Sequence, residues 1–134
     1  MKIRSANSTD ASQIAELNEV FVAVTSSMDA KRFLELFDLC SYCLVADDGQ
    51  RLLGFVIAMR NEAPYDNGNY QWFEKRVRNM VYVDRIVLAA DARGQGLGHQ
   101  LYDALSTMAL ADGCKVMTAE MDICLLYTSD AADE

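Results

Sequence analysis

The chain has little proline and no long apolar run. Of its 134 residues, one is proline and seven are glycine, which argues against a low-complexity or largely disordered protein. The longest apolar stretches are short and bounded by charges, as Leu52 to Met59 shows, so none spans a bilayer. The N-terminal segment Met1 to Ser5 goes straight into polar sequence and contains no apolar signal core. We therefore expect one globular domain in the cytoplasm, with no membrane partner.

Basic residues are also scarce. The sequence has 12 Lys and Arg against 20 Asp and Glu, a formal net charge of −8. An acidic chain has no general attraction for phosphate backbones, which argues against nucleic acid as a partner. The same charge weakly favours a cationic or amine ligand.

Histidine and cysteine are too few for a metal site. The only histidine is His99, and the cysteines are Cys40, Cys43, Cys114 and Cys124. Cys40 and Cys43 have CxxC spacing, but no second CxxC or histidine pair completes a zinc site. We expect free, buried thiols in a reducing cytosol and no bound metal.

Hydrophobic periodicity predicts short helices and strands in a mixed order. The predicted elements are a strand at 3–5, a helix that starts within 9–13 and runs to 24, a helix at 28–37, strands at 42–46 and 52–59, a short helix at 71–79, a strand at 80–88, a helix at 96–111 and a last strand at 115–121. This order predicts an α+β fold, with helices flanking one mostly antiparallel sheet.

A glycine-rich turn follows the strand at 80–88 and leads directly into an amphipathic helix. Its sequence is Arg93-Gly94-Gln95-Gly96-Leu97-Gly98. Glycines allow the backbone amides to turn toward a ligand, because no Cβ stands in the way. Amides at the positive end of a helix dipole favour an anion such as a pyrophosphate, and Arg93 adds a fixed positive charge.

Two common phosphate loops fit this turn poorly. A P-loop requires GxxxxGK[ST], and the turn has no Lys-Ser/Thr pair. A Rossmann fingerprint requires GxGxxG after a first strand with a parallel partner, whereas these glycines alternate at 94, 96 and 98, past the middle of the chain. A dinucleotide-binding oxidoreductase is therefore disfavoured. A plain helix-starting turn is the remaining alternative, and three alternating glycines beside an arginine argue against it.

The turn resembles the acyl-CoA-binding motif of the GNAT superfamily of N-acyltransferases. The family signature, Arg/Gln-x-x-Gly-x-Gly/Ala, is met by Arg93, Gly96 and Gly98. The order of elements over residues 1–122 is similar to that of the family's first five strands and three helices. Three further stretches resemble one bacterial branch of predicted acetyltransferases: Ala63 to Asp66, Asn69 to Phe73 and Val83 to Val87.

The resemblance implies acetyl-CoA as a cosubstrate and assigns residues to it. Backbone groups of the strand at 86–88 would pair with the pantetheine arm like an extra strand. Amides of the turn would hold the pyrophosphate, and His99 or Gln100 would reach a phosphate or a ribose. The implied cofactor-binding residues are Ile86, Val87, Leu88, Arg93, Gly94, Gln95, Gly96, Leu97, Gly98 and His99.

Two carboxylates within strand segments are candidates for the base that takes the proton of the attacking amine: Asp84 and Glu120. Alternation along a strand places Asp84 on one face with Ile86 and Leu88, so we expect it to look toward the thioester. Glu120 lies where the family's sheet splays open, and a partly apolar cleft there would raise its pKa toward neutrality. Each carboxylate also has a structural alternative. Asp84 would form a salt bridge, for instance with Arg60, and Glu120 would be a solvated charge at the end of a strand.

The aromatic residues between the third and fourth predicted strands allow two interpretations. Tyr65 and Tyr70 either cover the core or line an acceptor pocket, whereas packing is the expectation for Trp72 and Phe73. Tyr102, at helical spacing, is also expected to pack.

The chain departs from the family pattern at its end. A complete GNAT domain continues past its fifth strand with another helix and two more strands, and that helix often carries a tyrosine that acts as general acid toward the leaving thiolate. Here only residues 123–134 follow, and they resemble a translated adaptor sequence. We expect an acetyltransferase domain at 1–122, lacking the last helix and strands, and a non-native tail at 123–134. The exposed edge of the fifth strand makes a homodimer a hypothesis.

Two functions remain open from sequence. The first is an N-acetyltransferase that moves an acetyl group from acetyl-CoA to a primary amine of unknown identity, with activity weakened or lost in the truncated chain. The alternative is a non-catalytic acyl-CoA-binding domain.

Overall fold

The computed structural model of the protein describes residues 1–20 and 27–119. The described elements are β1 (Lys2–Ser5), α1 (Ala11–Glu19), α2 (Ala30–Leu39), β2 (Tyr42–Asp47), β3 (Leu52–Arg60), α3 (Gly68–Glu74), β4 (Met80–Leu88), α4 (Leu97–Ala111) and β5 (Val116–Ala119), with 3₁₀ turns η1 (Ser8–Asp10) and η2 (Ala90–Ala92). Glu120, Cys124 and the predicted tail lie outside the described residues.

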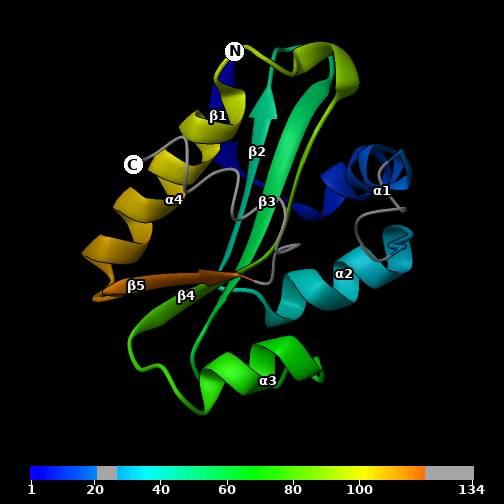
Figure 1. The fold of residues 1–134 in the computed structure, drawn as a ribbon. Helices are drawn as coiled ribbons and strands as arrows, with labels where there is room; N and C mark the ends of the chain where they lie inside the picture. The colour runs from blue at the N-terminus through cyan, green and yellow to red at the C-terminus, as the bar shows by residue number, and fades with distance from the viewer. Residues whose placement is uncertain (21–26, 120–134) are drawn as a thin grey trace.

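The five strands form one sheet in the order β1-β2-β3-β4-β5 (Figure 1). Neighbouring strands from β1 to β4 are antiparallel, and β5 runs parallel to β4. The predicted α+β fold with a mostly antiparallel sheet is therefore confirmed. A parallel neighbour requires a crossover between the strands, and α4 provides it.

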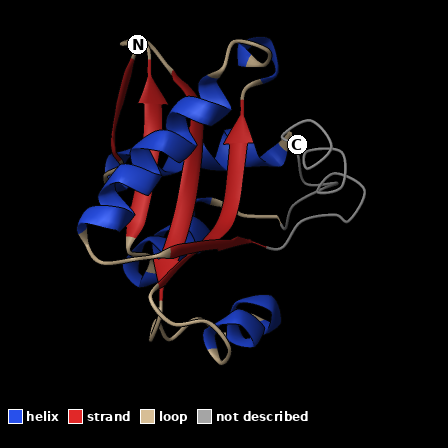
Figure 2. Ribbon diagram, turned by 60° about the vertical axis from the view of Figure 1, so that its left-hand side comes forward, coloured by secondary structure: helices blue, strands red, loops and turns tan. Residues whose placement is uncertain are grey.

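Helices cover both faces of the sheet (Figure 2). On one face, Leu101 and Leu105 of α4 pack against alternate residues of β2 to β4, such as Val56. On the other face, Ile14 of α1 and Phe33 of α2 pack against the remaining alternate residues. Because both faces are covered, β2 and β3 are almost continuously apolar. Within the described ranges, every helix is too short or too polar to traverse a lipid bilayer.

Side-chain caps set the starts of two helices. The Asp29 carboxylate accepts the Arg32 amide at 2.8 Å, so α2 begins at Ala30 rather than at residue 28. The Asn67 side chain accepts the Tyr70 amide at 2.9 Å, so α3 begins at Gly68. The prediction of a helix at 71–79 was therefore wrong in its bounds, because Asn67-Gly68 is a helix cap rather than a turn that ends before a helix.

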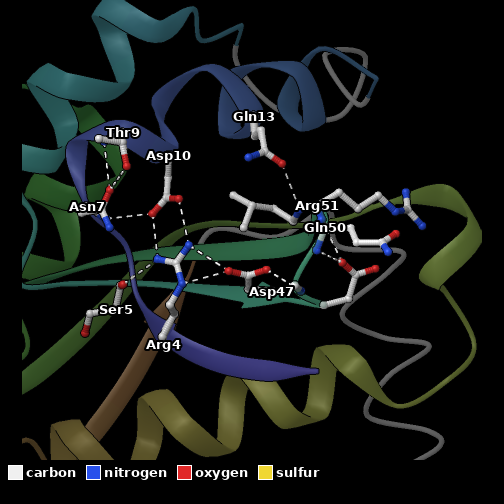
Figure 3. A network of polar contacts seen from close by, with 12 residues as sticks. Arg4, Ser5, Asn7, Thr9, Asp10, Gln13, Asp47, Gln50 and Arg51 are labelled. Atoms are coloured by element: carbon white, nitrogen blue, oxygen red, sulfur yellow. Dashed lines mark hydrogen bonds and ion pairs between the residues drawn. The ribbon is translucent and has the colours of Figure 1, made fainter.

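A polar network fastens β1 to its neighbours (Figure 3). The Arg4 guanidinium donates two hydrogen bonds of 2.9 Å to the Asp10 carboxylate, at the start of α1, and one of 3.1 Å to Asp47 at the end of β2. Hydrogen bonding from Arg4 lowers the pKa of the buried Asp10. Close by, the Gln13 side chain accepts the Leu52 amide at 3.0 Å. The network joins β1 and α1 to β2 and the start of β3.

Candidate functional site

The glycine-rich turn lies between the end of β4 and the start of α4. Gly94 and Gly96 both have a φ of 78°, the left-handed region that other residues adopt at a cost. A Cβ at either position would meet nothing within 4 Å, so the backbone angle requires glycine there and the space above the turn is open. These two glycines therefore set the backbone shape of the turn and leave the space above it empty of side-chain atoms of their own.

The first turn of α4 begins without a side-chain cap. Its N-cap residue is Gly96, which has no side chain that could accept from the helix amides. The first amides of a helix have no partner within the helix, so they stay available to an anion. With 15 residues, α4 also has a developed dipole at this end. The turn therefore fits a pyrophosphate by its geometry and its donors.

Packing joins the turn to the end of β4. Leu97, the first residue of α4, is buried, and a Cβ on Gly98 would lie 3.7 Å from the Leu88 side chain. Arg93 and His99 lie at the surface. The structure thus places the ten predicted cofactor-binding residues in one continuous stretch along the strand end, the turn and the helix start.

The strand end has an open edge. β5 pairs with β4 from Met80 to Val83 only. Among the described residues, no strand pairs with Ile86 to Leu88 on that edge, so this edge suits a ligand that pairs like a strand.

A bulge separates the two halves of β4. Ile57 of β3 pairs with Arg85, whereas the next residue, Ala58, pairs with Val83. Asp84 is the extra residue between these pairs. A bulge changes which face the following side chains occupy.

The bulge overturns one prediction about Asp84. Ile86 and Leu88 pack on the α4 face of the sheet. The Asp84 side chain instead bonds to Tyr65, which belongs to the core on the opposite face. The prediction that the three share a face was wrong, because strict alternation does not continue through a bulge.

Asp84 lies at the centre of a buried polar chain. The Tyr65 hydroxyl donates to Asp84 Oδ1 at 2.5 Å, and Arg85 Nε donates to Oδ2 at 2.8 Å. A guanidinium nitrogen of Arg85 then donates to the Asn18 side chain of α1 at 3.1 Å. The side chains of Arg85 and Asp84 are only 7% and 4% exposed. Burial and the Asp84 carboxylate raise the pKa of Tyr65, which keeps its proton at neutral pH.

The salt bridge considered from sequence involves a different partner. Asp84 pairs with Arg85, whereas Arg60 donates to the Asp112 carbonyl oxygen at 3.0 Å. Sequence reasoning missed Arg85 and Asn18. Asn18 had a usable signal, since it lies four residues after Ile14 on the buried face of a helix, where a polar side chain requires a partner.

The aromatic residues before β4 divide between core and surface. Tyr65 and Tyr70 are buried, and the Tyr70 hydroxyl holds the loop by donating to the Arg60 carbonyl oxygen at 2.6 Å. Phe73 packs against the core, as expected. Trp72 does not: it is 53% exposed, with the Arg76 guanidinium 4.2 Å from its ring centroid. Its predicted packing was wrong because α3 begins early and turns that position outward.

The loop also borders a hollow of about 560 Å³. Tyr65 lies in its wall, with Asp66, Glu62 and Glu74 as the acidic groups and Lys75 as the basic one. The hollow therefore has a net negative lining and lies against the buried chain that includes Asp84.

The described cysteines are free thiols. Cys43 and Cys114 are buried, as expected, and Cys40 is half-buried. Burial raises the pKa of Cys40 to about 11. Within residues 1–20 and 27–119, no three His, Cys, Asp or Glu side chains gather as metal ligands would.

Comparison with known proteins identifies the family. The acetyltransferase (GNAT) family model matches residues 10–126. No curated protein sequence matches the chain. Its fold is similar to that of an N-acetyltransferase from Staphylococcus aureus Mu50, with 20% identity over 98% of this chain and 79% of that one and a TM-score of 0.73. It is also similar to a ribosomal-protein-alanine N-acetyltransferase from Brucella melitensis biovar Abortus 2308 (23% identity, 91% and 80% covered, TM-score 0.68).

A third likeness concerns a structure with a ligand. A GNAT acetyltransferase from Brucella melitensis in complex with acetyl-CoA shares 16% identity over 91% of this chain and 76% of that one, with a TM-score of 0.68. Structures at these sequence identities show the fold alone. The family model, in contrast, matches most of the sequence, including the glycine-rich turn. The chain belongs to the GNAT family of acetyltransferases.

Proposed function

We propose that this protein transfers an acetyl group from acetyl-CoA to a primary amine. The observation that carries the proposal is the turn from Arg93 to Gly98, with its left-handed glycines, its uncapped helix start and an open strand edge beside it. A strand edge suits an amide-bearing arm, and the helix start suits a pyrophosphate. These two features lie next to each other, as an acyl-CoA requires.

The ten cofactor-binding residues keep the roles that the family resemblance assigned to them. The backbone of Ile86 to Leu88 pairs with the pantetheine arm. The amides from Gly94 to Gly98 bind the pyrophosphate, with Arg93 adding positive charge and His99 within reach of a phosphate or the ribose. Bound acetyl-CoA supplies an acetyl group activated as a thioester. No metal is required for this chemistry.

We assign the proton acceptor to a carboxylate, either Asp84 or Glu120. Asp84 lies at the bulge directly before the open strand edge, and its hydrogen bond from Tyr65 extends toward the hollow. Glu120 remains a prediction, since it lies outside the described residues. The acidic lining of the hollow supports a cationic or amine acceptor rather than nucleic acid.

One observation favours the alternative, a domain that binds acyl-CoA without turnover. Both oxygens of Asp84 already accept hydrogen bonds, one from Tyr65 and one from Arg85. A carboxylate whose two oxygens are held by neighbouring side chains is poorly placed to take a proton from an amine. The alternative predicts acetyl-CoA binding without acetyl transfer.

Three further features belong to the proposal. The acetyltransferase domain occupies residues 1–122 of a bacterial, cytoplasmic protein, and 123–134 are a non-native tail. β5 is the last strand of the described sheet, and Val116 and Met117 on it are exposed. Two chains would therefore form a homodimer along this strand.

An acetylation assay tests the proposal. The chain is incubated with acetyl-CoA and a panel of amines: amino acids, polyamines, amine drugs and peptides with a free N-terminus. Mass spectrometry detects a gain of one acetyl group. We expect one amine class to be acetylated by the wild type and not by Gly96→Glu. A chain that binds acetyl-CoA but acetylates none of them would support the non-catalytic alternative.

A further inference from the structure

A single side chain connects the buried carboxylate of β4 to the hollow beside α3. Asp84, Arg85 and Asn18 belong to the polar chain and do not line the hollow. Tyr65 belongs to both: it lies in the wall of the hollow, and its hydroxyl donates to Asp84 Oδ1 at 2.5 Å. Among the described residues that line the hollow, Tyr65 is the one whose side chain bonds to Asp84, so it provides a path for a proton between the hollow and this carboxylate.

Asp84 has little freedom to reach a ligand by itself. Its side chain is buried and does not line the hollow, and Arg85 Nε holds Oδ2 at 2.8 Å. Rotation of the carboxylate into the hollow would break this buried ion pair, which is strongly unfavourable. A group that lies between Asp84 and the hollow avoids that cost.

We propose that Tyr65 is a catalytic residue that takes the proton of the acceptor amine and passes its own proton to Asp84. The proposal rests on the acetyl transfer proposed above, and it places the amine in the hollow. It explains how a carboxylate that is closed off from solvent can still act in proton transfer.

The step balances as follows. The amine nitrogen forms a bond to the acetyl carbonyl carbon and becomes strongly acidic as it does so. Its proton moves to Tyr65 Oη while the phenolic proton moves to Asp84 Oδ1. The carbon–sulfur bond breaks, and a solvent proton neutralises the departing thiolate. Asp84 then returns its proton through Tyr65 to water, which restores the starting state.

In the part of the chain that the structure describes, the charged and titratable groups beside this path come from β4, from the lining of the hollow and from the residue after α2. Asp84, Arg85 and Tyr82 of β4 face Tyr65, while the hollow adds the Glu62, Asp66, Glu74 and Lys75 side chains named above. Cys40, which follows α2, faces Asp84, and its thiol stays protonated because burial raises its pKa to about 11. Arg85 pairs with Asp84 Oδ2 and leaves Oδ1 to accept the hydrogen bond from Tyr65.

The test compares Tyr65→Phe with Tyr42→Phe in the full chain. Both variants keep a buried ring and lose a hydroxyl that donates to a carboxylate at 2.5 Å, to Asp84 from Tyr65 and to Asp112 from Tyr42. Tyr42 packs on the α4 face of the sheet and does not line the hollow. We expect Tyr65→Phe to lower kcat about 100-fold, the range of a lost general acid or base, with KM for acetyl-CoA within about threefold of the wild type. Tyr42→Phe should keep kcat within about fivefold.

A pH profile and a spectroscopic titration separate proton transfer from packing. The pH profile of kcat in Tyr65→Phe should differ from that of the wild type, whereas Tyr42→Phe should keep the wild-type profile. Without any turnover, absorbance at alkaline pH reports tyrosine ionisation: Asp84→Asn should lower the pKa of one tyrosine, and the lowered titration should disappear in the double variant with Tyr65→Phe.

The outcomes distinguish the two proposals. Acetylation by wild type with unchanged kcat and pH profile in Tyr65→Phe would overturn the relay and leave the acetyltransferase function intact. Equal losses in Tyr65→Phe and Tyr42→Phe would also overturn it, because they would indicate packing. Absence of acetyl transfer by wild type to every amine would overturn both.

Discussion

Gly54 and Leu88 lie opposite each other in the register of β3 and β4, closer than any residue with a Cβ would allow. A Cβ on Gly54 would lie 2.8 Å from the Leu88 side chain and 2.9 Å from the carbonyl oxygen of Val87. The absence of a side chain at Gly54 thus fixes the strand end that we assign to the pantetheine arm.

Gly54→Ala should therefore weaken acetyl-CoA binding from a distance. The added methyl group would displace the backbone at Val87, at an overpacking cost of about 1–3 kcal/mol in the free energy of unfolding. We expect a 5- to 50-fold rise in the Kd for acetyl-CoA by calorimetry, roughly 1–2 kcal/mol of binding free energy. Gly68→Ala is the matched control, because a Cβ there meets nothing within 4 Å. Equal Kd values for both variants would contradict the role of the strand end.

The turn can be tested separately from its backbone strain. Gly96→Ala and Gly113→Ala each place an alanine at positive φ in open space, at the two ends of α4. Both should lower the free energy of unfolding by about 1–2 kcal/mol. Only Gly96→Ala should also weaken acetyl-CoA binding, since Gly113 lies at the far end of the helix. Loss of binding in both variants would show that global stability, not the turn, controls it.

The ion pair of Arg4 with the buried Asp10 predicts a dependence of stability on pH. The pKa of Asp10 is lower in the folded state than in the unfolded state. The ionised Asp10 therefore stabilises the fold above about pH 4, and this stabilisation is lost as the pH falls further. Asp10→Asn should cost about 2–3 kcal/mol at pH 7 by urea unfolding. The difference from wild type should shrink below pH 4.

Asp29→Asn provides the control for that series. Asp29 caps α2 at an exposed position, and asparagine caps a helix equally well. We expect its loss of stability to stay below about 0.5 kcal/mol. A constant difference between wild type and Asp10→Asn from pH 3 to pH 7 would contradict the ionic account.

Self-association along β5 should respond to a charge on the strand. Val116→Lys places a cation on the exposed strand edge, which discourages strand pairing between chains. We expect light scattering after gel filtration to give a dimer mass for wild type and a monomer mass for the variant. Leu34→Lys, at an exposed position on α2, should leave the mass unchanged. A monomeric wild type would rule out the dimer.

Much of the fold could be predicted because its signals are local. The apolar run at Met80–Leu88, the glycines of the turn and the leucines of α4 follow directly from sequence periodicity, and each appears where expected. The strand order follows from the same elements, since short turns make consecutive strands antiparallel neighbours and α4 provides the one crossover.

What sequence did not predict depends on contacts between distant residues or on a change of register. The bulge at Asp84 arises from how β3 and β4 pair, and neither strand signals it alone. Tyr65 meets Asp84 across 19 positions, and Arg4 meets Asp47 across 43. The early start of α3 was different, because Asn67 is a helix-capping residue type and its signal is visible in the sequence.

The most direct test of the central claim is a calorimetric titration of acetyl-CoA into the chain, with Gly96→Glu and a nicotinamide dinucleotide as controls. The glutamate adds negative charge and backbone strain where the pyrophosphate is expected. The account predicts saturable binding of one acetyl-CoA per chain, lost in Gly96→Glu and absent with the dinucleotide. A folded chain, shown by cooperative thermal unfolding, that binds no acetyl-CoA or prefers the dinucleotide would contradict it.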